Sequence, residues 1–196
     1  MTRPTVVLRT LLGGGLIAAN LLCGSLPLGA QAHPAGHTNA DTTKMLIPES
    51  MQTEHREIHD ALDRATRAPG NVGTAARELA KVLGPHFARE EQIALPPLGL
   101  LAPLARGEFT PAMLEVLPLT DSLRAELPRM LREHVAIHAA TVRLAEAARA
   151  GHDPAALRVA EQLLVHAQSE EQMFYPAALL VGEVVRARSA GRGRTP

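Results

Sequence analysis

Two segments of the chain, 86–96 and 166–176, carry the same pattern at a constant offset of 80 residues. The first reads HFAREEQIALP and the second reads HAQSEEQMFYP. The positions that are identical in the two copies are His86 and His166, Glu90 and Glu170, Glu91 and Glu171, Gln92 and Gln172, and Pro96 and Pro176. Repetition at a fixed spacing indicates that the fold contains two equivalent halves, each with the same functional residues.

A second repeated pattern precedes each copy and adds further histidines. It reads Glu-His-x-x-Ile-His at residues 54–59 and again at 133–138, 79 positions later. Side chains four residues apart lie one above the other on the same face of an α-helix. Each half can therefore direct a histidine pair and a His-Glu pair at one point between helices. We predict that eight side chains meet there: His55, His59, His86, Glu90, His134, His138, His166 and Glu170.

Buried imidazoles and carboxylates need a partner. Apolar residues such as Ile58, Leu83 and Ile137 flank the predicted site residues, so these polar side chains should project from the inner face of each helix. Burial of such groups without compensation is costly, and they must be paired with one another or bind a metal. Because histidine and carboxylate recur with the symmetry of the two halves, we predict a metal site rather than isolated core histidines.

The composition favours helices over sheets. The chain is 46% hydrophobic but only 2% aromatic, without tryptophan, and its Leu, Ala, Val and Ile residues suit helix packing better than a β-sandwich. Apolar spacing, prolines and glycines predict helices at about 48–68, 74–95, 120–150 and 154–188. Two short turns and one long middle connection predict an all-α fold, an antiparallel up-and-down four-helix bundle with a long connection between helices two and three. We expect kinks or breaks at Gly84-Pro85, Pro128 and Pro176.

The N-terminal residues are typical of an export signal. Arg3 and Arg9 precede an apolar run, and the small residues Ala30 and Ala32 mark a cleavage site, so we expect a signal peptide over 1–32 and a periplasmic or secreted protein. The alternatives are an uncleaved membrane anchor and lipidation at Cys23. After the signal peptide we expect a flexible tether at 33–44, the bundle at 45–188 and a disordered tail at 189–196. Twenty basic residues balance twenty acidic ones, so we expect no nucleic-acid partner and no membrane partner after cleavage.

The donor types restrict which metal can bind. Two histidines and one glutamate per ion suit non-heme iron, and two such sets suit a bridged pair of iron ions, with zinc or manganese as other possible occupants. Two octahedral ions offer about twelve positions, of which two bridging glutamates and a bridging solvent oxygen fill about six. Six histidines would then saturate the pair, whereas five would leave a position open for a small molecule. Whether His59 and His138 both bind is therefore the decisive question.

The order His, His-x-x-x-Glu, His, His-x-x-x-Glu, with Glu-Glu doublets and a following proline, resembles the hemerythrin-like (HHE cation-binding) domain family. The likeness spans residues 45 to 185 approximately. It implies a four-helix bundle with a non-heme di-iron centre that meets dioxygen, nitric oxide or peroxide. In the oxygen carriers the third helix gives two histidines, which correspond to His134 and His138, whereas His59 departs from the pattern. Their acid on the last helix corresponds to Glu171, but Glu170 has the same spacing as Glu90 and is our preferred bridge. The resemblance implies these ligands: His55, His86, Glu90, His134, His166 and Glu170.

Several neighbouring residues have two interpretations each. Tyr175 is either a donor in the pocket or, as we prefer, a packing residue. Four glutamates adjoin the predicted ligands and either accept hydrogen bonds from the ligand histidines or lie in solvent. These are Glu54, Glu91, Glu133 and Glu171.

Two classes of function fit this site. The first is an exported metal-binding protein, expected to be a monomer, that binds or senses dioxygen or buffers iron. The second is a di-iron enzyme that acts on peroxide, oxygen or nitric oxide. Because no acid or base is evident beyond the ligands, we favour the binding protein, with a small diatomic molecule or peroxide as its ligand. A site filled with zinc that only holds the helices together is a third reading.

Overall fold

A computed structural model describes residues 47–192, and within this range the chain is helical without any strand. The predicted signal peptide at 1–32 and tether at 33–44 lie outside the described residues. None of the helices in the described range is both long and apolar enough to cross a membrane. The elements in chain order are α2 (Glu49–Thr66), α3 (Gly70–Ile93), η1 (Pro96–Leu100), α4 (Leu101–Ala105), η2 (Pro111–Val116), α5 (Leu117–Ala150), α6 (Pro154–Ser169), the π-helical turn η3 (Glu170–Phe174) and α7 (Tyr175–Arg192).

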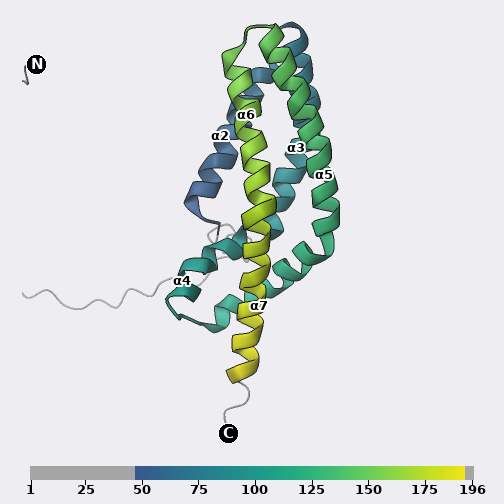
Figure 1. Cartoon of the computed structure of the whole chain (residues 1–196). Coiled ribbons are helices and arrows are strands. Elements are labelled where there is room, and N and C mark those ends of the chain that lie inside the picture. The colour runs from purple at the N-terminus through teal and green to yellow at the C-terminus, as the bar shows by residue number, and fades with distance from the viewer. Residues whose placement is uncertain (1–46, 193–196) are drawn as a thin grey trace, which may run out of the picture. The chain divides into compact units, whose positions relative to one another are not determined.

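Four rods form the bundle: α2, α3, α5, and α6 continued through η3 into α7 (Figure 1). Each rod packs against two neighbours, because α2 contacts α3 and α6, and α5 contacts the same two helices. Short turns between α2 and α3 and between α5 and α6 reverse the chain direction. The predicted all-α, up-and-down four-helix bundle is therefore confirmed. The last helix runs on to Arg192, beyond the end that we predicted at residue 188.

The two tight turns use the residues that such turns require. Gly70 begins α3 with a φ of 66°, a left-handed conformation that glycine adopts at little cost. Before α6, Oδ1 of Asp153 accepts hydrogen bonds from the backbone N–H groups of Ala155 and Ala156, both at 3.0 Å. Pro154 occupies the first helical position, where its missing N–H is not needed. Both features hold the helix pairs antiparallel.

The internal prolines have different effects. Helix α3 continues through Pro85 and α5 continues through Pro128, so the chain does not break at either proline. A proline crowds the Cβ of the residue before it, and Gly84 has none. Ahead of Pro176, by contrast, the helix widens into η3, where Tyr175 N–H bonds to the carbonyl of Glu170 five residues earlier. A proline also clashes with the carbonyl four residues before it, and the wider π turn relieves that clash.

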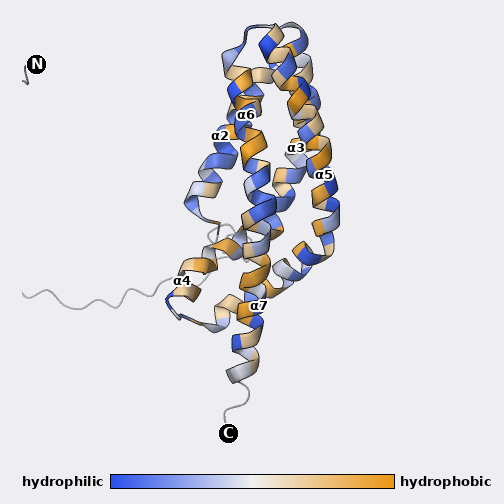
Figure 2. Cartoon of the chain, viewed as in Figure 1, coloured by the Kyte–Doolittle hydropathy of each residue, from blue (hydrophilic) through white to orange (hydrophobic). Residues whose placement is uncertain are grey.

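Two apolar clusters fill the bundle on either side of a polar middle. Along α2, the buried residues Met51 and Ile58 belong to different clusters, and His55 lies between them. Along α5, His134 lies in the same way between Met130 and Ile137. Figure 2 shows hydrophobic segments alternating with hydrophilic ones along the rods. The polar residues of the middle are thus enclosed by packed side chains from both ends.

The long connection between α3 and α5 packs against α7. Segments η1 and η2 both contact this helix. A third apolar cluster joins them, comprising Leu100, Leu104, Met113, Val116, Val181 and Val185. The connection therefore extends the core beyond the four-rod region at the end where α7 projects (Figure 1).

Candidate metal centre

Six of the eight predicted site residues lie buried in the middle of the bundle. Each rod contributes one histidine. Helix α3 and the rod formed by α6 and η3 also contribute one glutamate each. Their exposed fractions are small: His55 2%, His86 2%, Glu90 0%, His134 4%, His166 1% and Glu170 1%. Groups this polar are almost never so buried unless they are paired or bind a metal.

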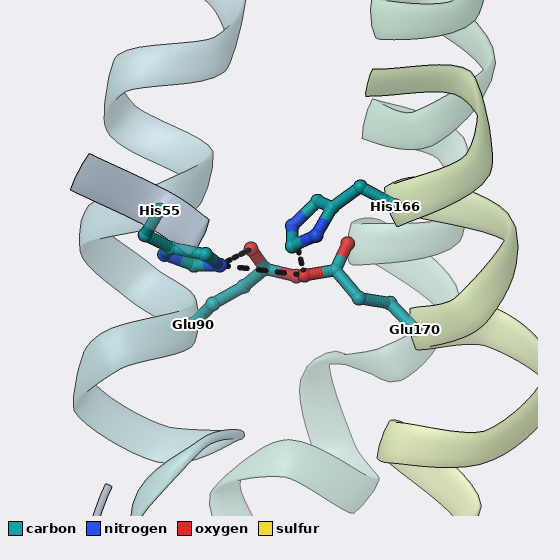
Figure 3. Close-up of side chains that lie close together, drawn as sticks. All are labelled: His55, Glu90, His166 and Glu170. Atoms are coloured by element: carbon teal, nitrogen blue, oxygen red, sulfur yellow. Dashed lines mark ion pairs between the residues drawn. The ribbon is translucent and has the colours of Figure 1, made fainter. Parts of the chain in front are cut away.

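The first quartet consists of His55, Glu90, His166 and Glu170, whose ligand atoms all lie within 4.8 Å of one another. Figure 3 shows these side chains pointing toward one another, His55 from α2, Glu90 from α3, and His166 and Glu170 from the rod formed by α6 and η3. The Nε2 atom of His166 lies 2.8 Å from Oε1 of Glu170. The Nε2 atom of His55 lies 3.6 Å from that oxygen and 3.9 Å from Oε2 of Glu90.

The second quartet consists of His86, Glu90, His134 and Glu170, whose ligand atoms also lie within 4.8 Å of one another. Nε2 of His86 lies 3.2 Å from Oε1 of Glu90. Nε2 of His134 lies 3.4 Å from Oε2 of Glu170 and 2.8 Å from Nε2 of His86. The two quartets thus have different histidines but the same two glutamates.

Each shared carboxylate directs one oxygen at each quartet. Glu90 directs Oε2 at His55 and Oε1 at His86. Glu170 directs Oε1 at His166 and Oε2 at His134. A carboxylate that offers separate oxygens to two sets of imidazoles can bridge two cations, one in each set.

Several atoms of the cluster are buried without a hydrogen-bond partner. They are Nε2 of His55, Oε2 of Glu90, both ring nitrogens of His166 and Oε1 of Glu170. All of them belong to the first quartet. A buried polar atom without a partner costs roughly 1–3 kcal/mol, and a bound cation would satisfy the nitrogens and oxygens that face the centre. The donor set therefore fits a metal.

The ionisation of the cluster reflects its crowded charges. Burial alone would lower the pKa of His86 and His166, but the neighbouring carboxylates, led by Glu90 and Glu170 respectively, outweigh burial and raise both to about 9. Burial followed by repulsion from Glu170 raises the pKa of Glu90. Burial opposes ionisation of Glu170 too, yet contacts with three histidines lower its pKa well below the ordinary value. The raised pKa values of His86 and His166 favour protonated imidazoles beside the buried carboxylates.

Four outer glutamates surround the cluster and pair with the Nδ1 atoms of its histidines. Each partner comes from the neighbouring rod, so the contacts form a closed ring around the bundle in the order α2, α3, α5, α6. A carboxylate accepts hydrogen bonds, so it favours a proton on Nδ1. The lone pair of Nε2 is then free to bind a metal ion at the centre. Three of the Nδ1-to-oxygen contacts are hydrogen bonds: His55–Glu91 3.4 Å, His86–Glu133 2.9 Å and His134–Glu171 2.8 Å. The fourth, His166–Glu54 at 3.2 Å, is an ion pair without hydrogen-bond geometry.

Tyr175 also reaches the cluster. Its side chain is 1% exposed, and its hydroxyl donates a short hydrogen bond to Oε1 of Glu90. The hydroxyl oxygen of Tyr175 lies 3.2 Å from Nε2 of His134 and 3.5 Å from Nε2 of His86. Burial and then the charges of Glu90 and Glu170 raise the pKa of this phenol. We expected Tyr175 mainly as a packing residue, and the structure places its hydroxyl inside the site.

The structure does not bring His59 and His138 to the centre, which corrects our prediction for these two. His59 is 74% exposed, and His138 is exposed on α5. A step of four residues overshoots a full helical turn by about 40°. The buried residues of α2 form a stripe that faces the interior of the bundle. Met51 and His55 in this inner stripe are already four residues apart, so the next buried residue is Ile58, three residues later. The adjacent His59 is left outside, and the same spacing leaves His138 beside Ile137.

A groove between α3 and α5 is lined in part by a histidine of the cluster. His86 and Glu133 line it together with Arg89 and Arg129. Arg89 pairs with Glu126, and Arg129 lies 3.3 Å from Glu133. The outer partner of His86 therefore belongs to a network of surface ion pairs.

Comparison with known proteins agrees with this geometry. The family model of the hemerythrin HHE cation-binding domain matches residues 46–178. A search of curated proteins and a search of solved structures found no match. The matched range includes every member of both quartets, the outer glutamates and Tyr175. The chain therefore belongs to the hemerythrin HHE cation-binding domain family.

Proposed function

We propose that this protein holds a pair of non-heme iron ions, one in each quartet, and uses them to bind a small molecule such as dioxygen reversibly. The observation that carries the proposal is the sharing of Glu90 and Glu170 between two sets of buried imidazoles. Cations in the two quartets would compensate the negative charge of the two buried carboxylates. They would also satisfy the buried atoms of the first quartet that have no partner and face the centre.

Iron is favoured over other metals by the donors. Each quartet supplies two imidazole nitrogens and two carboxylate oxygens and no sulfur, and residues 47–192 contain no cysteine. Such a set suits non-heme iron, whereas copper(I) and Fe–S clusters require softer sulfur ligands. Zinc and manganese accept the same donors, so metal analysis must separate them from iron.

The chain would keep the site dry and its donors in place. Bound iron supplies the change of oxidation state with which dioxygen can be held. Apolar clusters at both ends of the site exclude water. The outer glutamates would hold the four imidazoles with Nε2 directed inward, three through hydrogen bonds to Nδ1 and His166 through its ion pair with Glu54.

We further propose that the protein acts outside the cytoplasm. The support is the charged and apolar pattern of residues 1–32, followed by small residues at the expected cleavage point. Expression of the full chain and mass measurement of the protein recovered from the cell envelope or medium test this. A mature chain that begins at His33 is the expected result, and an intact N-terminus in the cytoplasm would contradict it.

The central experiment measures the metal content and visible spectrum of natively purified protein. We expect two iron ions per chain and a spectrum that changes reversibly when dioxygen is removed and returned. Colourless protein filled with zinc would contradict the proposal. Rapid catalytic consumption of peroxide or nitric oxide by iron-loaded protein would instead favour the enzyme.

A further inference from the structure

The two quartets have the same kinds of ligands but unlike surroundings. The hydroxyl of Tyr175 lies 3.2 Å and 3.5 Å from the Nε2 atoms of His134 and His86, which both belong to the second quartet. The first quartet instead adjoins Phe87. This ring stacks on His55 with centroids 4.1 Å apart and meets His166 edge-on at 5.5 Å. One quartet therefore has an additional oxygen donor, and the other has an apolar ring.

The backbone explains how Tyr175 reaches this position. Its N–H bonds to the carbonyl of Glu170, five residues earlier, within the π turn. On an α-helix, residues five apart diverge by about 140°, whereas a π turn brings them onto one face. Glu170 and Tyr175 can therefore both point into the site.

The repeat shows that the phenol is specific to one half. Leu95 occupies the position that corresponds to Tyr175, 80 residues earlier, and its N–H also bonds to a carbonyl five residues back, that of Glu90. Leu95 is fully buried. The same local backbone relation thus carries an aliphatic side chain in the first half and a phenol in the second.

The distances around the Tyr175 oxygen are those of donors that share one ion. Two donors at right angles on an octahedral ion, each about 2.1 Å from it, lie about 3 Å apart. The separations of the Tyr175 oxygen from the two Nε2 atoms are close to this value. The separations within the second quartet, 3.2 Å from His86 to Glu90 and 3.4 Å from His134 to Glu170, are similar.

We propose that Tyr175 is a direct ligand of the ion in the second quartet, so that an external small molecule binds to the ion in the first. This inference rests on the proposed function, because it assumes that both quartets hold iron. When the ion binds, the phenol loses the hydrogen bond to Glu90 and its proton passes to solvent. The Glu90 oxygen that accepted this hydrogen bond becomes free to bind the same ion.

The spectrum of the iron-loaded protein tests this assignment. A tyrosinate ligand gives ferric iron a charge-transfer band in the visible range, and resonance Raman excitation within that band enhances tyrosine ring vibrations. Tyr175 is the only tyrosine of the chain, so these vibrations can be assigned on unmodified protein. We expect Tyr175→Phe and Tyr175→Leu to lose the band, measured per bound iron ion. The leucine variant copies Leu95 and should pack well.

A matched control separates the hydroxyl from the packing of the segment. Phe174→Leu changes the neighbouring aromatic residue of the same π turn and should keep the band. Iron-loaded protein without tyrosine vibrations, or an unchanged band in Tyr175→Phe, would overturn the inference while leaving the proposed function intact. Failure of unmodified protein to take up iron would overturn both.

Discussion

The Nδ1 atom of His134 lies 2.8 Å from Oε1 of Glu171, which follows the buried Glu170 directly in the chain. One Glu-Glu doublet therefore supplies an inner carboxylate and an outer one. The inner residue is 1% exposed, while the side chain of the outer residue is 45% exposed. Adjacent residues of a helix diverge by about 100°, so the outer acid reaches the back of the histidine on the neighbouring rod.

Glu171→Gln should weaken metal binding by roughly 10- to 100-fold, the usual effect of losing the hydrogen-bond partner of a ligand histidine. The neutral amide is a weaker acceptor and can also present its N–H₂ group to Nδ1. A competition titration against a metal chelator measures the change.

Glu91→Gln should have a smaller effect than Glu171→Gln, because Glu91 is 3.4 Å from Nδ1 of His55. Glu57→Gln, on the exposed face of α2, serves as the control and should leave affinity unchanged. Equal affinities for all three variants would mean that the outer ring does not hold the histidines.

Glu90→Gln should reduce the metal content of the chain, because a neutral amide does not bridge two cations as a carboxylate does. Metal analysis of the purified variant measures the effect. If the variant bound metal normally, Glu90 would not be a bridge.

His55→Ala should abolish binding at the first quartet, whereas His59→Ala and His138→Ala should leave the metal content unchanged. His59 lies in solvent beside Asp60 at 3.8 Å, and neither it nor His138 belongs to a quartet. Metal-to-chain ratios of the purified variants give the answer. Equal losses for His55→Ala and His59→Ala would show that α2 presents both histidines to the metal.

The sequence predicted the helices and the six converging residues because both follow from local spacing. The prediction was wrong for His59 and His138. The spacing of the buried residues that precede each pattern already distinguished these two histidines from the six ligands. Before His86 and His166 the inner stripe takes a step of three, from Leu83 and Leu163, so the following step of four reaches a glutamate. Before His55 and His134 the inner stripe has already taken a step of four, so the next buried residue follows three positions later.

The π turn and the role of Tyr175 were harder to foresee. We expected Pro176 to bend the helix, but spacing alone does not say whether a helix bends or widens. The side chain that faces inward then depends on that outcome, because widening brings Tyr175 over Glu170. The outer ring depends on contacts between rods, which a sequence without known packing does not specify. The feature of the sequence that indicated the outer ring was the glutamate next to each set of predicted ligands.

Gly182→Ala should destabilise the protein by about 1–3 kcal/mol, the usual cost of overpacking. Helix α7 passes so close to α5 that a Cβ at Gly182 would clash with the side chain of Thr120. Gly191→Ala, in the same helix but with open space around it, is the control and should be neutral or slightly stabilising. Chemical denaturation measures both, and adding Thr120→Ala to Gly182→Ala should recover part of the loss.

The metal-free protein should lose stability as the pH rises from about 6.5 to about 9. His86 and His166 have an ordinary pKa of 6.5 and a folded pKa of about 9. The folded state therefore binds their protons more tightly, and this stabilisation is complete below 6.5 and lost as the pH passes 9. The raised pKa of Glu90 acts in the same direction. The effect should be on the order of a few kcal/mol for each histidine.

Metal binding should depend on pH in the opposite way, because the ion displaces the protons from these imidazoles. Thermal unfolding in chelator should show a melting temperature that falls across this interval, while the apparent metal affinity rises across it. Proton release on metal addition, followed with a pH indicator, gives an independent measure. A metal-free protein whose melting temperature rises between these pH values would mean that the buried imidazoles are neutral in the folded chain and that the carboxylates do not hold their protons.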